Sequence, residues 1–319
     1  MGLPRLSVED LALARRSDGA RLLQGVSFTV ADGEILGIVG ESGSGKSLLM
    51  RAIAGMLPEG IVLAGGRVRL DGEDLAGLSG PAWRRLRGPG IAMVFQDPFA
   101  SLNPLRRVGD VIAEAVRAHH VLPWPAARAR AVAALDAVGL AQPAVLARRF
   151  PHELSGGQRQ RALIALARVN DPRVLIADEP TTALDPTARL GVLDCLAAGA
   201  AARATLVVTH DLFAAARICT RIGVMYGGLL VELGPLKDLF SAPAHPYLRA
   251  LLDAQPRIGA VDPPAPIPGA APSAAEPSPG CRFAPRCLRA QVVCRDVAPL
   301  LSAHAGRAAA CHHPIEAGP

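Results

Sequence analysis

Residues 40–47 read Gly40-Glu41-Ser42-Gly43-Ser44-Gly45-Lys46-Ser47. They match the pattern G-x-x-x-x-G-K-[ST], and they stand between the apolar run of residues 35–39 and a helical pattern over residues 46–56. Glycines let consecutive backbone N–H groups turn toward an anion, and the start of a helix adds partial positive charge. We therefore expect residues 40–47 to form a phosphate loop, in which Lys46 reaches the β- and γ-phosphates of a nucleotide and Ser47 ligates Mg²⁺.

Around this loop the pattern is that of an α/β protein. Residues 5–39 alternate as strands do, and short apolar runs predict further buried strands at residues 91–95, 174–177 and 205–208. Runs of this kind suit a mainly parallel sheet that is covered on both faces. Residues 104–170 are instead rich in Ala, Leu and Arg at helical spacing, so we expect a helical insertion between the strands.

The apolar run of residues 174–177 leads directly into two carboxylates, Asp178 and Glu179. A pair of acids after a strand is by itself more often a solvated loop. Together with a phosphate loop it has a specific use, because Mg²⁺ and an attacking water both need carboxylates at the nucleotide. We expect Asp178 to hold the metal, usually through water, and Glu179 to orient or deprotonate the nucleophilic water.

Composition excludes several classes of protein. No run of the 319 residues approaches the roughly 20 apolar residues that cross a bilayer, and no signal-peptide pattern opens the chain. We therefore expect a soluble protein that reaches membranes only through partners. The formal charge is +6, but the arginines are scattered and aromatics do not interleave with them, so we expect no nucleic-acid partner. Lys46 and Lys237 are the only lysines.

The segment Leu154-Ser155-Gly156-Gly157-Gln158 resembles the signature of the ABC ATPases. The flanking motifs follow in the order of that family: Gln96 looks like the Q-loop glutamine, Asp185 like the D-loop aspartate and His210 like the switch histidine. The resemblance covers about residues 5–240. It implies the P-loop ABC ATPase fold, with a RecA-like parallel sheet, an antiparallel β subdomain and a helical signature subdomain at about residues 104–170, all within an ATP-binding domain of residues 1–254.

The same resemblance implies a composite ATP site, because the signature faces the nucleotide of a second ABC ATPase subunit. That subunit is a sister chain or a second copy of this one. The family pattern makes Glu179, His210 and Gln96 catalytic, assigns Mg²⁺ to Ser47, Gln96 and Asp178, and puts at ATP the residues Gly40, Ser42, Gly43, Gly45, Lys46, Ser47, Ser155, Gly156, Gly157, Gln158 and Asp185. Relatives usually stack an aromatic ring on adenine, whereas residues 14–20 contain none, and an arginine is the available substitute.

Several stretches are similar to the oligopeptide/dipeptide permease branch: residues 95–104, 151–153, 178–185, 245–252 and 267–269, although Leu248 stands where the branch usually has Thr. The branch implies an ATP-hydrolysing subunit of a peptide importer, bound at the cytoplasmic face of the inner membrane to two permease subunits and served by an extracytoplasmic solute-binding protein. Uptake of nickel or a metallophore is an alternative cargo. A soluble ABC ATPase without transport, or a regulatory module that has lost hydrolysis, fits the sequence less well.

Six cysteines fall into two groups. Cys195 and Cys219 stand alone in apolar helical patterns and are expected in the core. The others lie beyond a Pro/Ala-rich linker, residues 255–280, in a tail of residues 281–319. No pair in the tail is as close as in a zinc knuckle, and four thiolates suit a [4Fe–4S] cluster, which the branch resemblance also implies. Zinc, with His304, His312 or His313 as substitutes, or unligated thiols are the alternatives for Cys281, Cys287, Cys294 and Cys311.

Overall fold

The structure is a computed structural model that describes residues 3–182, 184–256 and 264–316. It contains two compact units, and neither is one continuous piece of chain. The first unit includes Thr29–Ile35 and Arg69–Val208, and the second includes Val8–Phe28, Leu36–Val68 and the chain from Thr209 onward. Both units contain helices and strands, so the predicted α/β class is confirmed.

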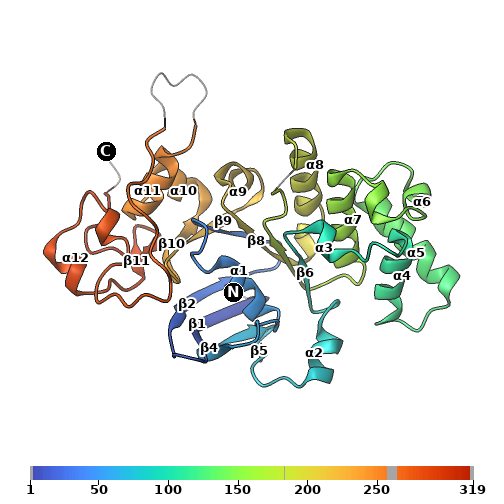
Figure 1. Ribbon diagram of the computed structural model, residues 1–319, viewed down its shortest axis with the longest axis horizontal. Coiled ribbons are helices and arrows are strands. Elements are labelled where there is room, and N and C mark those ends of the chain that lie inside the picture. Colours follow the sequence, from blue (N-terminus) through green and yellow to red (C-terminus); the bar gives the residue numbers. More distant parts are fainter. Residues whose placement is uncertain (1–2, 183, 257–263, 317–319) are drawn as a thin grey trace. The chain divides into compact units, whose positions relative to one another are not determined.

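In the second unit, the strand that leads into the phosphate loop has parallel and antiparallel neighbours. Strand β3 (Ile35–Val39) is buried along its whole length and runs parallel to β9 (Arg221–Tyr226). Strand β9 pairs antiparallel with β10 (Leu229–Pro235). Beyond β10 lie two short strands of the tail, β12 (Arg307–Ala309) and β11 (Ser302–His304). The cysteine-bearing tail therefore extends the sheet by adding strands to β10 rather than hanging free (Figure 1).

The remaining strands and helices outside residues 75–208 lie mostly in the second unit, whereas β5 belongs to the first. A second sheet has the order β2-β1-β4-β5, and its last pair joins Arg69 to Asp74 and Leu70 to Glu73. The predicted helix after the phosphate loop is α1, which ends three residues earlier than expected. The bounds of these elements are β1 Leu6–Arg15, β2 Arg21–Val30, β4 Ile61–Leu70, β5 Glu73–Asp74, α1 Lys46–Ile53, α9 Leu212–Ile218, α10 Leu236–Ser241, α11 Pro246–Asp253, η3 Ala284–Arg286 and α12 Val292–Asp296.

The first unit has a parallel sheet of three buried strands, in the order β8-β7-β6. These strands are β6 (Ile91–Val94), β7 (Val174–Asp178) and β8 (Ala204–Thr209), and they fall on the three apolar runs from which strands were predicted. The parallel register aligns Val94 with Ala177 and Asp178 with Val208. The carboxyl ends of β6 and β7 therefore meet at one edge, which is where parallel sheets bind ligands.

Residues 104–170, for which a helical insertion is predicted, contain the helices α4, α5, α6 and α7. Helix α4 contacts α5 and α7, and α7 also contacts α3, α8 and β6, so the signature helix is the shared support of this region (Figure 1). The helices of the first unit are α2 Gly80–Leu86, α3 Pro98–Ser101, α4 Val108–Arg117, α5 Trp124–Ala137, α6 Pro143–Leu146, η1 Pro151–Glu153, α7 Gly156–Arg168, α8 Pro186–Ala197 and η2 Ala200–Ala202.

Two cysteines lie in the core, as predicted. Cys195 on α8 and Cys219 at the end of α9 are buried, and burial raises the pKa of Cys219 to about 12. Residues 264–280 of the predicted linker contain no helix or strand, and residues 257–263 of it lie outside the described part. Among the helices of the described ranges, none is long and apolar enough to cross a membrane.

Candidate functional site

The phosphate loop follows β3 with a backbone that only glycine tolerates at two positions. Gly40 has φ 151°, and a Cβ there would lie 2.2 Å from the carbonyl oxygen of Met225. Gly45 has φ 100°, and its Cβ would lie 2.6 Å from the side chain of Leu23. Helix α1 begins directly after Gly45, with no side chain capping its first N–H groups. A helix start of this kind is a site for anions such as phosphate.

Lys46 turns back over the loop that precedes it. Its Nζ donates hydrogen bonds to the carbonyl oxygens of Gly40 and Glu41, both at 2.8 Å. The side chain is 5% exposed, so its ammonium group is held in a fixed place by the loop's own backbone. Ser44 is buried beside it, and its carbonyl oxygen accepts a bond from the N–H of Gly228. Hydrogen bonds within the protein therefore hold the phosphate loop in this conformation.

In the first unit, β7 delivers the two carboxylates. Asp178 ends the strand and is buried, and Glu179 follows it in the left-handed region at φ 46°. A non-glycine residue in that region is uncommon and costs energy, as residues at functional sites often do. The Oε2 atom of Glu179 accepts hydrogen bonds from Gln96 Nε2 at 3.1 Å and Thr182 Oγ1 at 3.0 Å. The structure therefore brings two predicted catalytic residues, Gln96 and Glu179, into contact and fixes the carboxylate.

The signature segment begins α7 with a reciprocal cap. Ser155 Oγ accepts from the N–H of Gln158, while the Oε1 atom of Gln158 accepts from the N–H of Ser155. This cap orients the helix start, and it leaves the N–H groups of Gly156 and Gly157 at the position where helices bind anions. A Cβ on Gly157 would lie 2.8 Å from the Cβ of Ala188 on α8, so close helix packing requires this glycine.

The segment after Gln96 is joined to the signature segment by one arginine. Arg159 donates from Nε to the carbonyl oxygen of Pro151 and from Nη2 to that of Leu154, each at 2.9 Å. Its guanidinium carbon also lies 3.6 Å from the centre of the Phe99 ring, on the short helix α3. The buried side chain of Arg159 therefore connects α3 to the start of α7.

Asp185 and His210 lie at helix starts. Asp185 Oδ1 accepts from the N–H of Ala188 and caps α8. His210 is exposed and follows β8 directly, while the next residue, Asp211, caps α9 through the N–H groups of Phe213 and Ala214. His210 belongs to the second unit, whereas Asp185 and Glu179 belong to the first.

The expected adenine contact lacks a ring. β1 ends at Arg15, whose Nη1 forms an ion pair with Asp18 at 2.8 Å, and residues 3–27 include no aromatic side chain. Arg15 and Arg16 are both exposed at this turn. Arg16 is the better candidate to stack on adenine, because Arg15 is already paired with Asp18.

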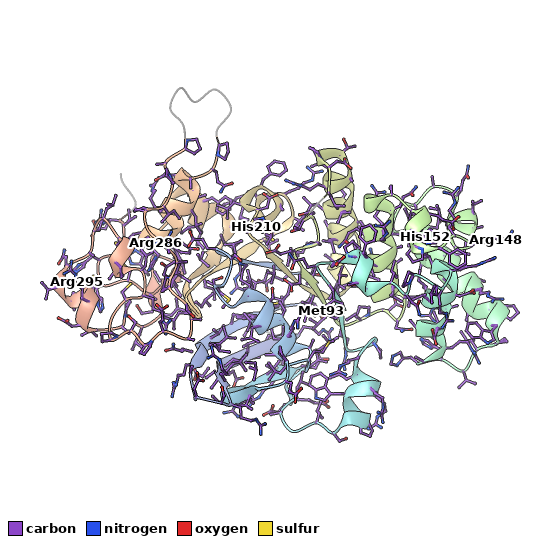
Figure 2. The ribbon with its side chains drawn as sticks, viewed as in Figure 1. Met93, Arg148, His152, His210, Arg286 and Arg295 are labelled. Carbon is purple, nitrogen blue, oxygen red and sulfur yellow. The ribbon has the colours of Figure 1, made fainter. Side chains whose placement is uncertain are left out.

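Two side chains that the sequence analysis did not single out contact the phosphate loop. The hydroxyl of Tyr247, on α11, accepts a hydrogen bond from the N–H of Glu41 at 2.8 Å, and burial raises the pKa of that hydroxyl. Arg286, in the tail and labelled in Figure 2, forms two hydrogen bonds with the carboxylate of Glu41. Tyr247 lies in one of the stretches that resemble the permease branch. No sequence pattern around Arg286 distinguishes it from the other arginines.

The four tail cysteines line one small cavity of about 20 Å³, together with His245, His312 and His313. Burial, together with the neighbouring thiols, raises the pKa of the Cys311 thiol to about 11. In the ranges that the structure describes, no three Cys, His, Asp or Glu side chains are grouped so that they could hold a metal ion. Four thiols thus line one cavity without being grouped as ligands of a metal ion.

Comparison with known proteins finds two family models on this chain. The model described as ABC transporter matches residues 23–182. The model described as the C-terminal region of oligopeptide/dipeptide transporters matches residues 231–294. The first match includes the phosphate loop, the signature segment and Glu179. The second includes Tyr247, Arg286 and three of the four tail cysteines.

Among curated proteins, the oligopeptide transport ATP-binding protein OppD of Mycobacterium tuberculosis is 48% identical over 89% of this chain. The chain spans about half of that relative's length, 47%. A putative peptide import ATP-binding protein of Brucella abortus is 42% identical over 97% of this chain and 94% of its own. Among solved structures, the dimeric cassette MJ0796, a bacterial ABC transporter cassette, is 27% identical with a TM-score of 0.64, over 72% of this chain and 98% of that one.

Proposed function

This chain belongs to the ABC transporter ATP-binding proteins, in the oligopeptide/dipeptide branch, and from that premise we propose that it binds and hydrolyses ATP to drive uptake of di- and oligopeptides. The observation that carries the enzymatic half is the Glu179 carboxylate, fixed by Gln96 and Thr182 at the end of a buried strand. The transport half rests on the match over residues 231–294 and on relatives named for peptide import.

Each part of the proposed ATP site has a physical task. The N–H groups of residues 40–47 bind the phosphates, and Lys46 neutralises charge on the β- and γ-phosphates. The donor set fits Mg²⁺, since Ser47, Gln96 and Asp178 offer the oxygen ligands that this ion prefers. When bound, Mg²⁺ neutralises charge on the phosphate oxygens. Glu179 accepts a proton from the attacking water, and His210 contacts the γ-phosphate.

The signature segment acts on the nucleotide of a second subunit. Ser155, Gly156, Gly157 and Gln158 meet the phosphates held by the partner, with Asp185 beside them. A sister ATPase or a second copy of this chain fills that place. Support comes from the start of α7, where the N–H groups of Gly156 and Gly157 lie at the position at which helices bind anions, and from a similar cassette whose structure is titled dimeric. ATP then holds two subunits together, and hydrolysis releases them.

The membrane role follows from partners. We place the chain at the cytoplasmic face of the inner membrane, beneath two permease subunits that receive peptides from an extracytoplasmic binding protein. Phe99 is 66% exposed and lies on α3, a helix that contacts the signature helix α7. It is therefore a suitable contact for a permease. Nickel or a metallophore is the alternative cargo, and relatives named for peptides favour the first choice.

Reconstitution of the full complex tests this function. The chain, its permease subunits and its binding protein are placed in proteoliposomes containing ATP. We expect uptake of a labelled tripeptide that needs ATP and stops when Glu179 is replaced by glutamine. A labelled nickel complex serves as the competing cargo. Uptake of nickel without uptake of peptide would contradict the proposed substrate, and ATP turnover without any uptake would contradict transport.

We also infer that the four cysteine thiolates of the tail bind a [4Fe–4S] cluster as its ligands. All six cysteines of the chain are free thiols, and four of them line one cavity. In a tetrahedral zinc site with bonds of about 2.3 Å the sulfurs would stand roughly 3.8 Å apart. Four cysteine thiolates are the usual ligand set of a [4Fe–4S] cluster. Because the cavity is only about 20 Å³, the loops that carry Cys281, Cys287, Cys294 and Cys311 have to move apart around a cluster.

Spectroscopy of anaerobically purified protein tests the cluster. We expect a broad absorption at about 400 nm and about four iron atoms per chain. Replacing Cys294 with serine should remove both, because it deletes one thiolate ligand. Replacing the core residue Cys195 with serine is the matched control and should leave both unchanged. A colourless protein that carries zinc would show that this inference is wrong.

A further inference from the structure

We propose that Arg286, in the cysteine-bearing tail, is a positioning residue for the phosphate loop and sets the affinity of this chain for ATP. The proposal rests on the proposed function, since it concerns the same ATP site. Its basis is an ion pair between Arg286 and Glu41, which are 245 residues apart in the sequence. Arg286 Nη1 lies 2.6 Å from Glu41 Oε2, and Nη2 lies 3.0 Å from Oε1.

The geometry of the pair is that of a strong contact. Two parallel N–H···O bonds between a guanidinium and a carboxylate are shorter and more directional than a single ion pair. The side chain of Arg286 is 6% exposed and that of Glu41 is 27% exposed, so solvent screens the pair less than it screens surface pairs. An isolated pair at the surface contributes little, and this one is different because its arginine is buried.

Glu41 connects Arg286 to the phosphate-binding lysine, Lys46. Its carbonyl oxygen accepts from Lys46 Nζ at 2.8 Å, and its N–H donates to the hydroxyl of Tyr247, also at 2.8 Å. The backbone of Glu41 is therefore fixed on both sides of its α-carbon, and its side chain is fixed by Arg286. A shift of Glu41 therefore moves its carbonyl oxygen, which is a hydrogen-bond acceptor for the Lys46 ammonium group that binds the phosphates.

Arg286 is itself held in place by the tail. Its Nε donates to the carbonyl oxygen of Pro268 at 2.7 Å, and its Nη1 also donates to the hydroxyl of Tyr226 at 3.2 Å. Phe283, three residues earlier, contacts the rings of Tyr226 and Tyr247, with both centroids 5.3 Å away. The guanidinium is thus ordered before it meets Glu41, so little conformational freedom is lost in forming the pair.

Charge gives the arginine a second effect. Glu41 places a carboxylate within a loop that must bind the negative phosphates of ATP. Arg286 neutralises that carboxylate from the side. Without Arg286, the carboxylate repels the phosphates and the loop loses one of its fixed contacts. Both effects weaken ATP binding, whereas the step that breaks the phosphate bond depends on Glu179 and is not touched.

Equilibrium binding of a fluorescent ATP analogue to the full chain tests the proposal. Replacing Arg286 with alanine is expected to weaken binding by on the order of tenfold, within the usual range of coupling between sites. The rate at saturating ATP should change less than about twofold, so the Michaelis constant moves and kcat does not. Arg286→Lys should recover part of the loss, since lysine restores the charge but not the paired hydrogen bonds.

Arg282 provides a matched control from the same loop. It is as buried as Arg286, and its Nη1 donates to the carbonyl oxygens of Ser273 and Ala274 rather than to a residue of the phosphate loop. Arg282→Ala should lower the melting temperature without changing ATP affinity. If Arg282→Ala and Arg286→Ala lower the melting temperature alike and neither changes affinity, Arg286 is structural only and the proposal is wrong.

A double-mutant cycle separates positioning of the loop from general damage to the fold, and Arg286→Lys replaces Arg286→Ala in it if the alanine variant folds poorly. In a Glu41→Gln background the bare carboxylate is gone, so adding Arg286→Ala should weaken binding less than about threefold. An equal loss in both backgrounds would refute the pairing. These outcomes differ from failure of the proposed function, in which the unaltered chain would show no ATP hydrolysis at all.

Discussion

Replacing Glu179 with glutamine should stop ATP hydrolysis while ATP stays bound. We expect turnover to fall by about a hundredfold to ten-thousandfold, the usual contribution of a general base. Glutamine keeps the shape of the side chain, and its amide oxygen still accepts the hydrogen bonds from Gln96 and Thr182. It cannot take a proton from water. The ATP that is not hydrolysed should hold two subunits together, which size-exclusion chromatography with ATP detects.

Glu73 offers the matched control for this change. It lies on β5 in the same unit, is exposed, and pairs through its backbone with Leu70 rather than with any residue of the site. Glu73→Gln should hydrolyse ATP like the unaltered chain. A Glu179→Gln variant that keeps more than about a third of the turnover would remove the general-base role from Glu179.

Lys46→Arg should abolish tight ATP binding although it keeps the positive charge. Hydrogen bonds to charged groups contribute about 1.5–3 kcal/mol, so losing one well-placed donor weakens binding by roughly 10-fold to 150-fold. Lys46 is 5% exposed, and its ammonium group lies 2.8 Å from two loop carbonyl oxygens. A planar guanidinium is wider and does not fit that position without displacing the loop.

Lys237 is the natural control, because it is the only other lysine of the chain and is exposed on α10. Lys237→Arg should bind the fluorescent ATP analogue as the unaltered chain does. Circular dichroism and the melting temperature check that both variants fold. Equal ATP affinity for Lys46→Arg and the unaltered chain would show that the loop recognises charge alone.

Much of the fold could be read from local patterns. Strand β3 and the loop after it are specified by an apolar run, three glycines and a lysine within a dozen residues, because each requirement is met by neighbours in sequence. The buried strands β6, β7 and β8 were likewise found from short apolar runs. Gln96 and Glu179 are assigned to one site only by the family resemblance, since 83 residues separate them, and their hydrogen bond was not predicted.

The parts that escaped prediction depend on long-range contacts. Arg286 is one of many arginines, which supply all but two of the 34 basic side chains, so composition gives it no distinction. Glu41 occupies a variable position of the loop pattern. Their pairing arises only when the tail folds onto the sheet. The same holds for β11 and β12, which are too short to show an alternating pattern.

The strands of the tail also cover a sheet edge that could otherwise pair with strands of other chains. β12 pairs with β10 at Glu232↔Ala309 and Leu233↔Ala308, and the N–H of Ala310 donates to the carbonyl oxygen of Val231, so backbone groups in this part of β10 are occupied. The segment Leu229-Leu230-Val231 is apolar, and an open edge with such a sequence invites other chains to add strands. A chain cut before β11 has that open edge. The tail therefore prevents self-association through this edge, and we expect a chain cut before β11 to aggregate.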